Sequence, residues 1–178
     1  TNLKRSLFLA SQIIDLKIPC VLALNMMDMV KKQLITIKLD ELERRLGVRV
    51  IPINARDEDG IEELKQVLLS SISVPINDIF ETSNLAPKLL NGLKDILHLK
   101  SNYTALQIAH HIESIDDFHF TKEQNEKATS FVAMDSVDLE NLKSHETLER
   151  YKVIQDVLLH SVSKGESKKK QSNSQHID

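Results

Sequence analysis

The 178-residue chain contains few of the residues that build common phosphate, metal and redox sites. It has only four glycines (Gly47, Gly60, Gly92 and Gly165), which are too far apart to form a glycine-rich loop that cradles phosphates. Its single cysteine, Cys20, excludes a disulfide framework and a thiolate zinc site, and is typical of a reducing compartment.

The chain also lacks an excess of positive charge and a long apolar run. Lys plus Arg number 23 and Asp plus Glu 26, a net charge of −3, so we expect no nucleic-acid partner. No apolar run approaches the roughly 18 residues of a membrane span. The opening apolar stretch soon meets Gln12 and Asp15, which argues against a signal peptide. Because the chain opens on Thr1 rather than Met, we expect it to be a piece of a longer protein.

Residues 1–74 alternate helical and strand patterns. Residues 20–24 form a continuous apolar run, which is typical of a strand buried on both faces of a parallel sheet. Residues 48–53 form the second such run, with Pro52 expected near its end. Helical spacing over residues 3–14, 39–46 and 61–72 completes the order helix, strand, helix, strand, helix, which predicts a parallel sheet. Two strands do not complete such a domain, so we expect either further strands upstream of Thr1 or poor folding of the segment alone.

After Pro75 the pattern becomes helical, and no further strand is predicted. Residues 83–163 are predicted to form a small helical bundle. Thr121 and Gln124 have the spacing of a capping box, and the longest helix runs from about Leu148 to Val162. A weaker pattern around Leu139 leaves room for a separate short helix. Residues 164–178 are predicted to be a solvated linker or tail, with a basic stretch against an anionic membrane as the alternative.

Two short polar motifs follow the two predicted strands. Ligands of parallel sheets bind at the carboxyl ends of the strands, so two such motifs on adjacent strands can build one pocket. The alternative without a binding function is two ordinary strand-to-helix turns with capping residues. The motifs are Asn25-Met26-Met27-Asp28 and Asn54-Ala55-Arg56, the latter followed by the acidic turn at residues 57–60.

These motifs carry a family resemblance. Asn25-x-x-Asp28 resembles the guanine-specificity motif of small GTPase domains, and Asn54-Ala55-Arg56 resembles their second base-contacting motif. Residues 1–7, 22–28, 45–48 and 60–64 resemble the cytoplasmic GTPase of ferrous iron transport protein B. The resemblance covers about residues 1–163; it is strong over residues 1–70 and thinner in the bundle, where the segment at residues 149–154 carries it.

The resemblance implies an α/β fold followed by an all-α one. Residues 1–74 would form the C-terminal part of the GTPase domain, with a partial parallel sheet of the P-loop GTPase type. Residues 83–163 would form a helical regulatory bundle that slows nucleotide release, and residues 164–178 a linker to the membrane region. The partners implied are the N-terminal half of the GTPase domain and the membrane domain, at the cytoplasmic side of the bacterial inner membrane.

The implied ligand is GTP or GDP. The Asp28 carboxylate can accept both parallel N–H donors of guanine, whereas adenine would leave it unpaired. Asn25 would bond the base and the phosphate loop, and the Ala55 amide would donate to the 6-oxo group. Met26 stands where most GTPases have Lys, and its thioether can pack flat on the base. The implied guanine-binding residues are Asn25, Met26, Asp28, Asn54, Ala55 and Arg56. Asn54 departs from the usual Ser, and Glu58 stands where Gly is common.

The phosphate half of a GTPase site is absent from the sequence. There is no Gly-x-x-x-x-Gly-Lys-Ser/Thr loop, no switch threonine for Mg²⁺ and no Asp-x-x-Gly. Mg²⁺ would therefore be bound by other parts of the parent domain, and these residues alone should not hydrolyse GTP. We assign no catalytic residue and no metal ligand; the histidines His110, His111 and His119 are typical of a solvated helix end. The alternative function is a non-catalytic interaction module, a helical bundle with a partial α/β cap.

Overall fold

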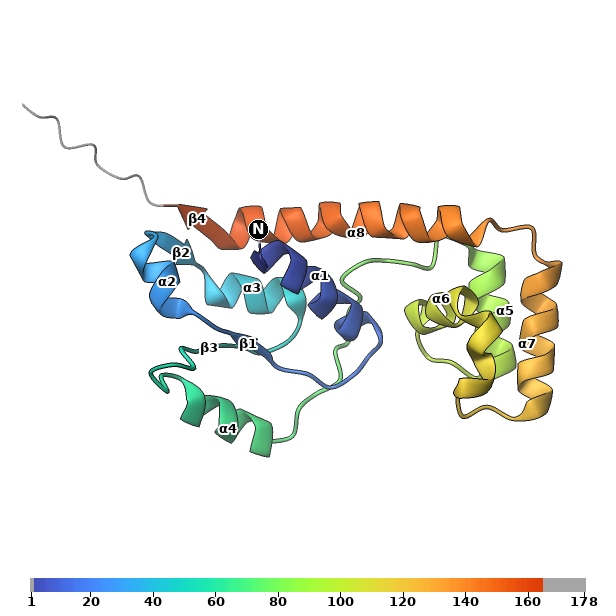
Figure 1. Ribbon diagram of the computed structural model, residues 1–178, viewed down its shortest axis with the longest axis horizontal. Helices are drawn as coiled ribbons and strands as arrows, with labels where there is room; N and C mark the ends of the chain where they lie inside the picture. Colours follow the sequence, from blue (N-terminus) through green and yellow to red (C-terminus); the bar gives the residue numbers. More distant parts are fainter. Residues whose placement is uncertain (1, 165–178) are drawn as a thin grey trace, which may run out of the picture.

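The structure is a computed structural model that describes residues 2–164, in which an α/β part is joined to a helical bundle (Figure 1). The α/β part contains α1 (Asn2–Asp15), β1 (Leu22–Leu24), α2 (Met27–Lys32), β2 (Ile35–Ile37), α3 (Leu39–Leu46), β3 (Val50–Pro52) and α4 (Ile61–Leu69). The remaining elements are α5 (Pro87–Leu97), α6 (Asn102–His110), the 3-10 helix η1 (Ile112–Asp117), α7 (Lys122–Met134), α8 (Leu139–Ser161) and β4 (Val162–Lys164).

The two predicted strands exist and pair in parallel, as β1 and β3. Leu22 lies opposite Val50, and Leu24 lies opposite Pro52, which is the last residue of β3 as expected. The prediction that the first strand is buried on both faces is wrong, because only Leu24 of β1 is buried while Ala23 is exposed. The physical reason is that, within residues 2–164, this sheet has only two strands and lacks the neighbours that would cover the rest.

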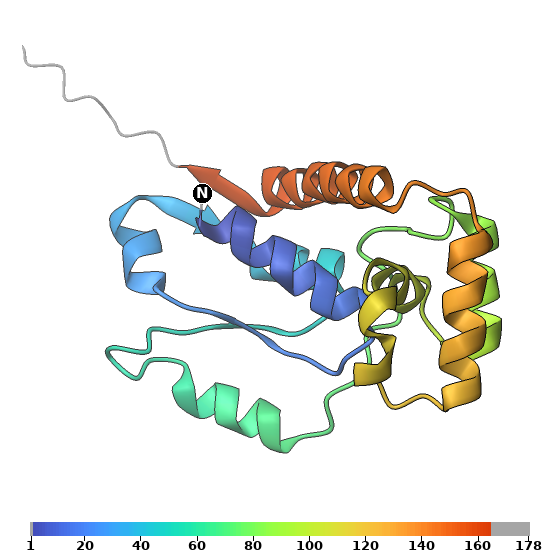
Figure 2. The same ribbon diagram turned by 45° about the vertical axis from the view of Figure 1, so that its right-hand side comes forward.

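Helix α4 shares this lack of cover. It lies across the strands from α1 and α3 (Figures 1 and 2). The predicted helical pattern is present, but none of its residues is buried, and Leu68 and Leu69 are 54% and 89% exposed. Apolar side chains of both β1 and α4 are therefore left uncovered within residues 2–164.

Three elements were not predicted from the sequence: α2, β2 and β4. β2 and β4 pair antiparallel with Thr36 opposite Ser163, so the expectation of no strand after Pro75 is wrong. Three-residue strands are too short to show alternation, and Val162 continues the helical spacing of α8. The predicted tail starts one residue too early, because Lys164 ends β4; residues 165–178, including Lys168–Lys170, lie outside the described residues.

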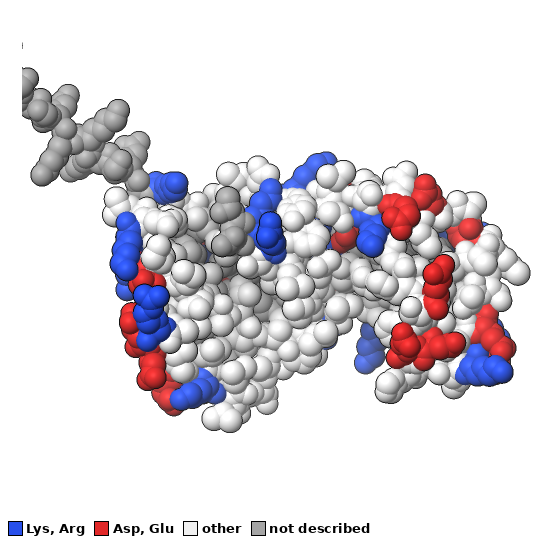
Figure 3. Space-filling model, viewed as in Figure 1, with Lys and Arg blue, Asp and Glu red and all other residues white. Residues whose placement is uncertain are grey.

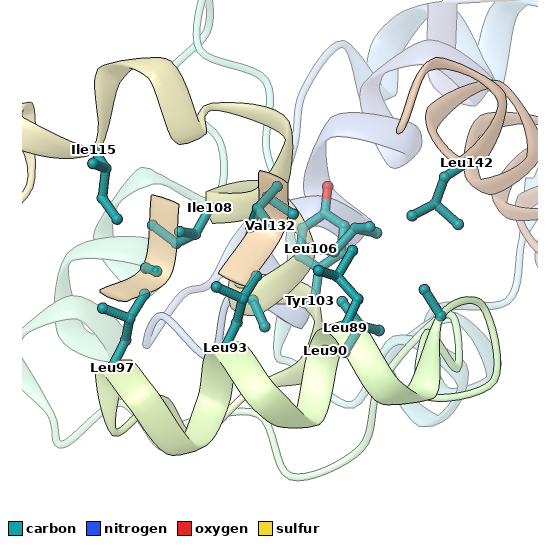
Figure 4. Close-up of a cluster of buried hydrophobic side chains, with 14 residues drawn as sticks. Leu89, Leu90, Leu93, Leu97, Tyr103, Leu106, Ile108, Ile115, Val132 and Leu142 are labelled. Carbon is teal, nitrogen blue, oxygen red and sulfur yellow. The ribbon is translucent and has the colours of Figure 1, made fainter. Parts of the chain in front are cut away.

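The bundle encloses the larger apolar core. The inner face of α5 meets α6 and α7 there, and Gly92 of α5 lies directly against the ring of Phe131. Thr121 and Gln124 form the predicted capping box at the start of α7, and Gly47 caps α3 in a left-handed conformation. The core side chains shown in Figure 4 include Leu89, Leu90, Leu93, Leu97, Tyr103, Leu106, Ile108, Ile115, Val132 and Leu142.

Helix α8 belongs to both parts of the molecule. It is one continuous helix of 23 residues, so the separate short helix around Leu139 is not formed. Its Leu142 packs in the bundle core, whereas Ile154 and Val157 pack with α1 and α3 in a second core. The division into domains over residues 1–74 and 83–163 stays a prediction, and α8 physically connects the two.

Candidate functional site

The two polar motifs lie side by side at the carboxyl ends of β1 and β3. The Ile53 amide donates to the Leu24 carbonyl at 2.9 Å, which extends the parallel pairing beyond the strands. The Met27 amide in turn donates to the Ile53 carbonyl at 3.3 Å. The two loops therefore share one edge of the sheet, where ligands of parallel sheets bind.

Asn25 bridges the two loops. Its side-chain Oδ1 accepts the amide N–H of Met26 at 2.7 Å and that of Ala55 at 3.2 Å. The resemblance implied that the Ala55 amide donates to a base, but in this structure that amide faces Asn25 instead. The 3.2 Å separation between the Ala55 nitrogen and the Asn25 oxygen is at the long end of the range for an N–H···O bond.

Met26 is held in an unusual conformation. Its φ of 67° and ψ of 39° lie in the left-handed region, which non-glycine residues rarely adopt. The residue is 57% exposed, so its thioether stands in solvent at the loop edge. An exposed apolar side chain held by a strained backbone is a feature that clusters at ligand sites.

Asp28 lies in the first turn of α2, four residues before Lys32. Its Oδ2 is 3.2 Å from the Lys32 ammonium. The hydrogen bond from Lys32 lowers the pKa of Asp28, and the positive charge of Arg56 on the other loop acts in the same direction. Asp28 is therefore ionised near neutral pH and is purely a hydrogen-bond acceptor.

Asn54 has a structural role in the second loop. It is mostly buried, and its side-chain amide donates to the Asp57 carboxylate. Its backbone amide donates to the Asp59 carbonyl at 2.9 Å, which closes the turn. Glu58 within this turn has a φ of 59°, which accounts for the glycine that is common at this position in the resembling family.

The edge that carries these residues is open rather than enclosed. Asn25, Met26, Ala55 and Arg56 are all exposed. A cavity of about 640 Å³ lies instead at the amino ends of the strands, lined in part by Val48 and the linker at residues 70–73. Acidic and basic side chains lie next to one another at the end of the molecule where α2 and the loop after β3 are found (Figure 3).

Residues 2–164 contain neither a candidate metal site nor a candidate membrane span. No group of three or more His, Cys, Asp or Glu side chains is placed to hold a metal ion there. His110 is partly buried on α6, where burial lowers its pKa, and His111 is exposed. Within this part of the chain, no helix has both the length and the apolar character needed to cross a membrane.

The fold defines a class: an α/β part with an attached helical bundle, which it shares with solved cytosolic domains of FeoB proteins. A structure of the cytosolic domain of L. pneumophila FeoB aligns over 91% of this chain with a TM-score of 0.66 and 29% identity. A structure of mGMPPNP-bound NFeoB from S. thermophilus aligns over 93% with a TM-score of 0.65; at 22% identity it shows the fold alone.

The sequence comparisons point to one family. Residues 1–68 match the family model of ferrous iron transport protein B. The Fe(2+) transporter FeoB of Escherichia coli is 43% identical over 91 residues, and that of Salmonella typhimurium is 46% identical over 65 residues. The similarity to the ferrous iron transport protein B family thus extends over residues 1–68 in the family model and over 91 residues in the Escherichia coli relative.

Each match covers a larger share of this chain than of the relative it is aligned with. The Escherichia coli alignment includes 51% of this chain but only 11% of the transporter. The solved L. pneumophila domain is covered over 64% of its length. The chain therefore corresponds to a small part of the curated relatives and to about two thirds of the cytosolic domain.

Proposed function

We propose that these residues are the base-recognition part of a GTPase domain, together with its helical domain, from a bacterial Fe²⁺ transporter. The observation that carries the proposal is the bridge from Asn25 to the Ala55 amide. It joins both base-contacting motifs at the edge of the sheet where the ionised Asp28 stands. The family match over residues 1–68 covers both motifs.

Guanine recognition would follow from the chemistry of three groups. The Asp28 carboxylate would accept the ring N–H and the amino group of guanine, releasing Lys32. The Ala55 amide would turn from Asn25 to the 6-oxo group. The exposed Met26 thioether would cover one face of the base, and Arg56, whose charge acts on Asp28, would line the same site.

The rest of the activity would depend on residues that this sequence does not contain. Phosphates and Mg²⁺ would be bound by the other half of the GTPase domain, against the uncovered faces of β1 and α4. The purified 178 residues should therefore show no GTP turnover. In the complete protein, at the cytoplasmic side of the inner membrane, nucleotide state would bias the helical domain and hence the passage of Fe²⁺.

Replacement of Asp28 by Asn tests the proposal that this carboxylate recognises guanine. In the full-length protein that contains these residues, fluorescent GDP should bind and the adenine analogue should not. Asp28→Asn presents one donor and one acceptor in place of two acceptors, which suits xanthine rather than guanine. We expect guanine affinity to fall by about 100-fold, because the site's pairing is broken, with xanthine nucleotide affinity rising.

Asp40→Asn is the matched control. Asp40 is a carboxylate in the first turn of α3, as Asp28 is in the first turn of α2, but it lines the cavity at the other end of the strands. It should leave binding unchanged. If Asp28→Asn bound guanine and xanthine nucleotides with the same affinities as the wild-type protein does, the proposed function would be contradicted.

A further inference from the structure

The two-stranded β2–β4 ribbon connects the loop at residues 25–28, which carries Asp28, to the end of α8. Asp28 is the second residue of α2, and α2 is followed along the chain by β2. β2 pairs with β4, which continues directly from α8 after Ser161. In sequence β4 lies more than 130 residues after Asp28, yet in the fold only α2 and β2 come between them (Figure 1).

Helix α2 is short, and the described element it contacts most is β2 of this ribbon. It is six residues long and has no buried residue. Met27, at its start, packs against the α/β core, and the rest of the helix packs on β2. Two non-glycine residues in left-handed conformations bracket it, Met26 with φ 67° and Leu34 with φ 53°. Such residues hold their conformation only where the surrounding structure enforces it.

The other side of the ribbon is firmly attached. The Lys38 amide donates to the Ser161 carbonyl at 2.8 Å, where β2 passes into α3 and α8 passes into β4. Arg45 of α3 pairs with Asp156 of α8 at 2.7 Å. The contact between α3 and α8 thus extends through the ribbon to α2. Within the ribbon, β4 is the strand that continues from α8.

We propose that β4 is a regulatory element of the base site: its pairing with β2 holds α2, and through it Asp28, in the position that accepts guanine. This inference rests on the proposed function. Loss of the pairing would leave β2 and α2 without the support of α8 and would loosen Asp28. By linkage, guanine binding would in turn strengthen the β2–β4 pairing and restrain the chain that follows α8.

The strand register supplies a matched pair of variants. Because Lys38 and Ser161 form a hydrogen-bonded pair, alternation makes Thr36 and Ser163 the next one, so the Ser163 amide points toward β2. The Lys164 amide points away. Ser163→Pro therefore removes a ribbon hydrogen bond, whereas Lys164→Pro, one residue later in the same strand, removes none.

Hydrogen exchange measures the coupling in the 178-residue chain without any nucleotide. We expect amide exchange in residues 27–34 to be about tenfold faster in Ser163→Pro than in wild type and unchanged in Lys164→Pro, since the pairing holds α2. Exchange in α5 and α6 should be equal in all three proteins, which checks that the fold is intact. Unchanged exchange in residues 27–34 of Ser163→Pro would overturn the proposal.

Nucleotide release in the full-length protein measures the effect on the site. Fluorescent GDP should dissociate about fivefold to tenfold faster from Ser163→Pro than from Lys164→Pro, the lower end of the range typical of coupling between two sites. If wild type binds GDP and both variants release it equally fast, this inference is wrong and the proposed function stands. If wild type binds no guanine nucleotide, the proposed function itself fails.

Discussion

Asp15 and Arg150 form a fully buried ion pair, with the Arg150 Nη1 2.6 Å from the Asp15 Oδ2. Arg150 also bonds Glu146 within α8, and its guanidinium lies 4.6 Å from the centre of the Tyr103 ring. Asp15 accepts the Ile79 amide at 2.6 Å. The pair therefore joins α1, the linker before α5, α6 and α8 at one point, so both parts of the molecule meet around a single guanidinium.

Removal of the guanidinium should be strongly destabilising. Arg150→Met keeps most of the apolar volume but leaves the Asp15 and Glu146 carboxylates buried without a cation. Breaking one side of a buried ion pair costs about 3–5 kcal/mol, so the free energy of unfolding should fall by that amount. Urea denaturation followed by circular dichroism measures it.

An exposed pair on the same helix provides the control. Lys152 lies 2.6 Å from Glu149, as close as the buried pair, but its side chain is 71% exposed. Lys152→Met should change the unfolding free energy by less than about 1 kcal/mol, because water screens the pair. If Arg150→Met and Lys152→Met lowered the free energy of unfolding by similar amounts, burial would not be the reason that the Asp15–Arg150 pair stabilises the fold.

Gly92 is required by the packing of α5 on α7. A Cβ at this position would overlap the ring of Phe131. Gly92→Ala should therefore lower the unfolding free energy by about 1–3 kcal/mol through overpacking, although alanine is the better helix former. The double variant Gly92→Ala/Phe131→Leu should recover part of the loss. A stabilised Gly92→Ala would mean that α5 and α7 do not approach as closely as described.

The sequence predicted the elements whose patterns are long. The helices α1, α3, α5 and α7 follow from apolar spacing, and the strands β1 and β3 from their apolar runs. The capping box at Thr121 is confirmed because it depends only on neighbouring residues. The exposure of β1 and α4 could not be predicted, because burial depends on which other elements lie against a strand or helix.

Only part of the candidate site could be predicted from the sequence. Its position at the edge of the sheet follows from the order of strands and motifs, and the adjacency of Asn25 and Ala55 agrees with it. The pairing of Asp28 with Lys32 could have been suspected from the four-residue spacing on a helix, but α2 itself was not predicted. The β2–β4 ribbon depends on contacts between residues far apart in sequence, which short strands do not reveal.

Glu41 should titrate at unusually low pH. Hydrogen bonds from Arg44 and Arg45 lower its pKa from an ordinary value of 4.5 to about 2. Because the folded-state pKa lies below the unfolded one, the stabilisation is fully present above about pH 4.5 and is lost as the pH falls toward 2. Carbon-detected NMR of the Glu41 carboxyl measures the midpoint. Arg44→Ala should raise the midpoint, since Arg44 supplies the larger share, and a wild-type midpoint near 4.5 would show that these arginines do not hold the carboxylate in solution.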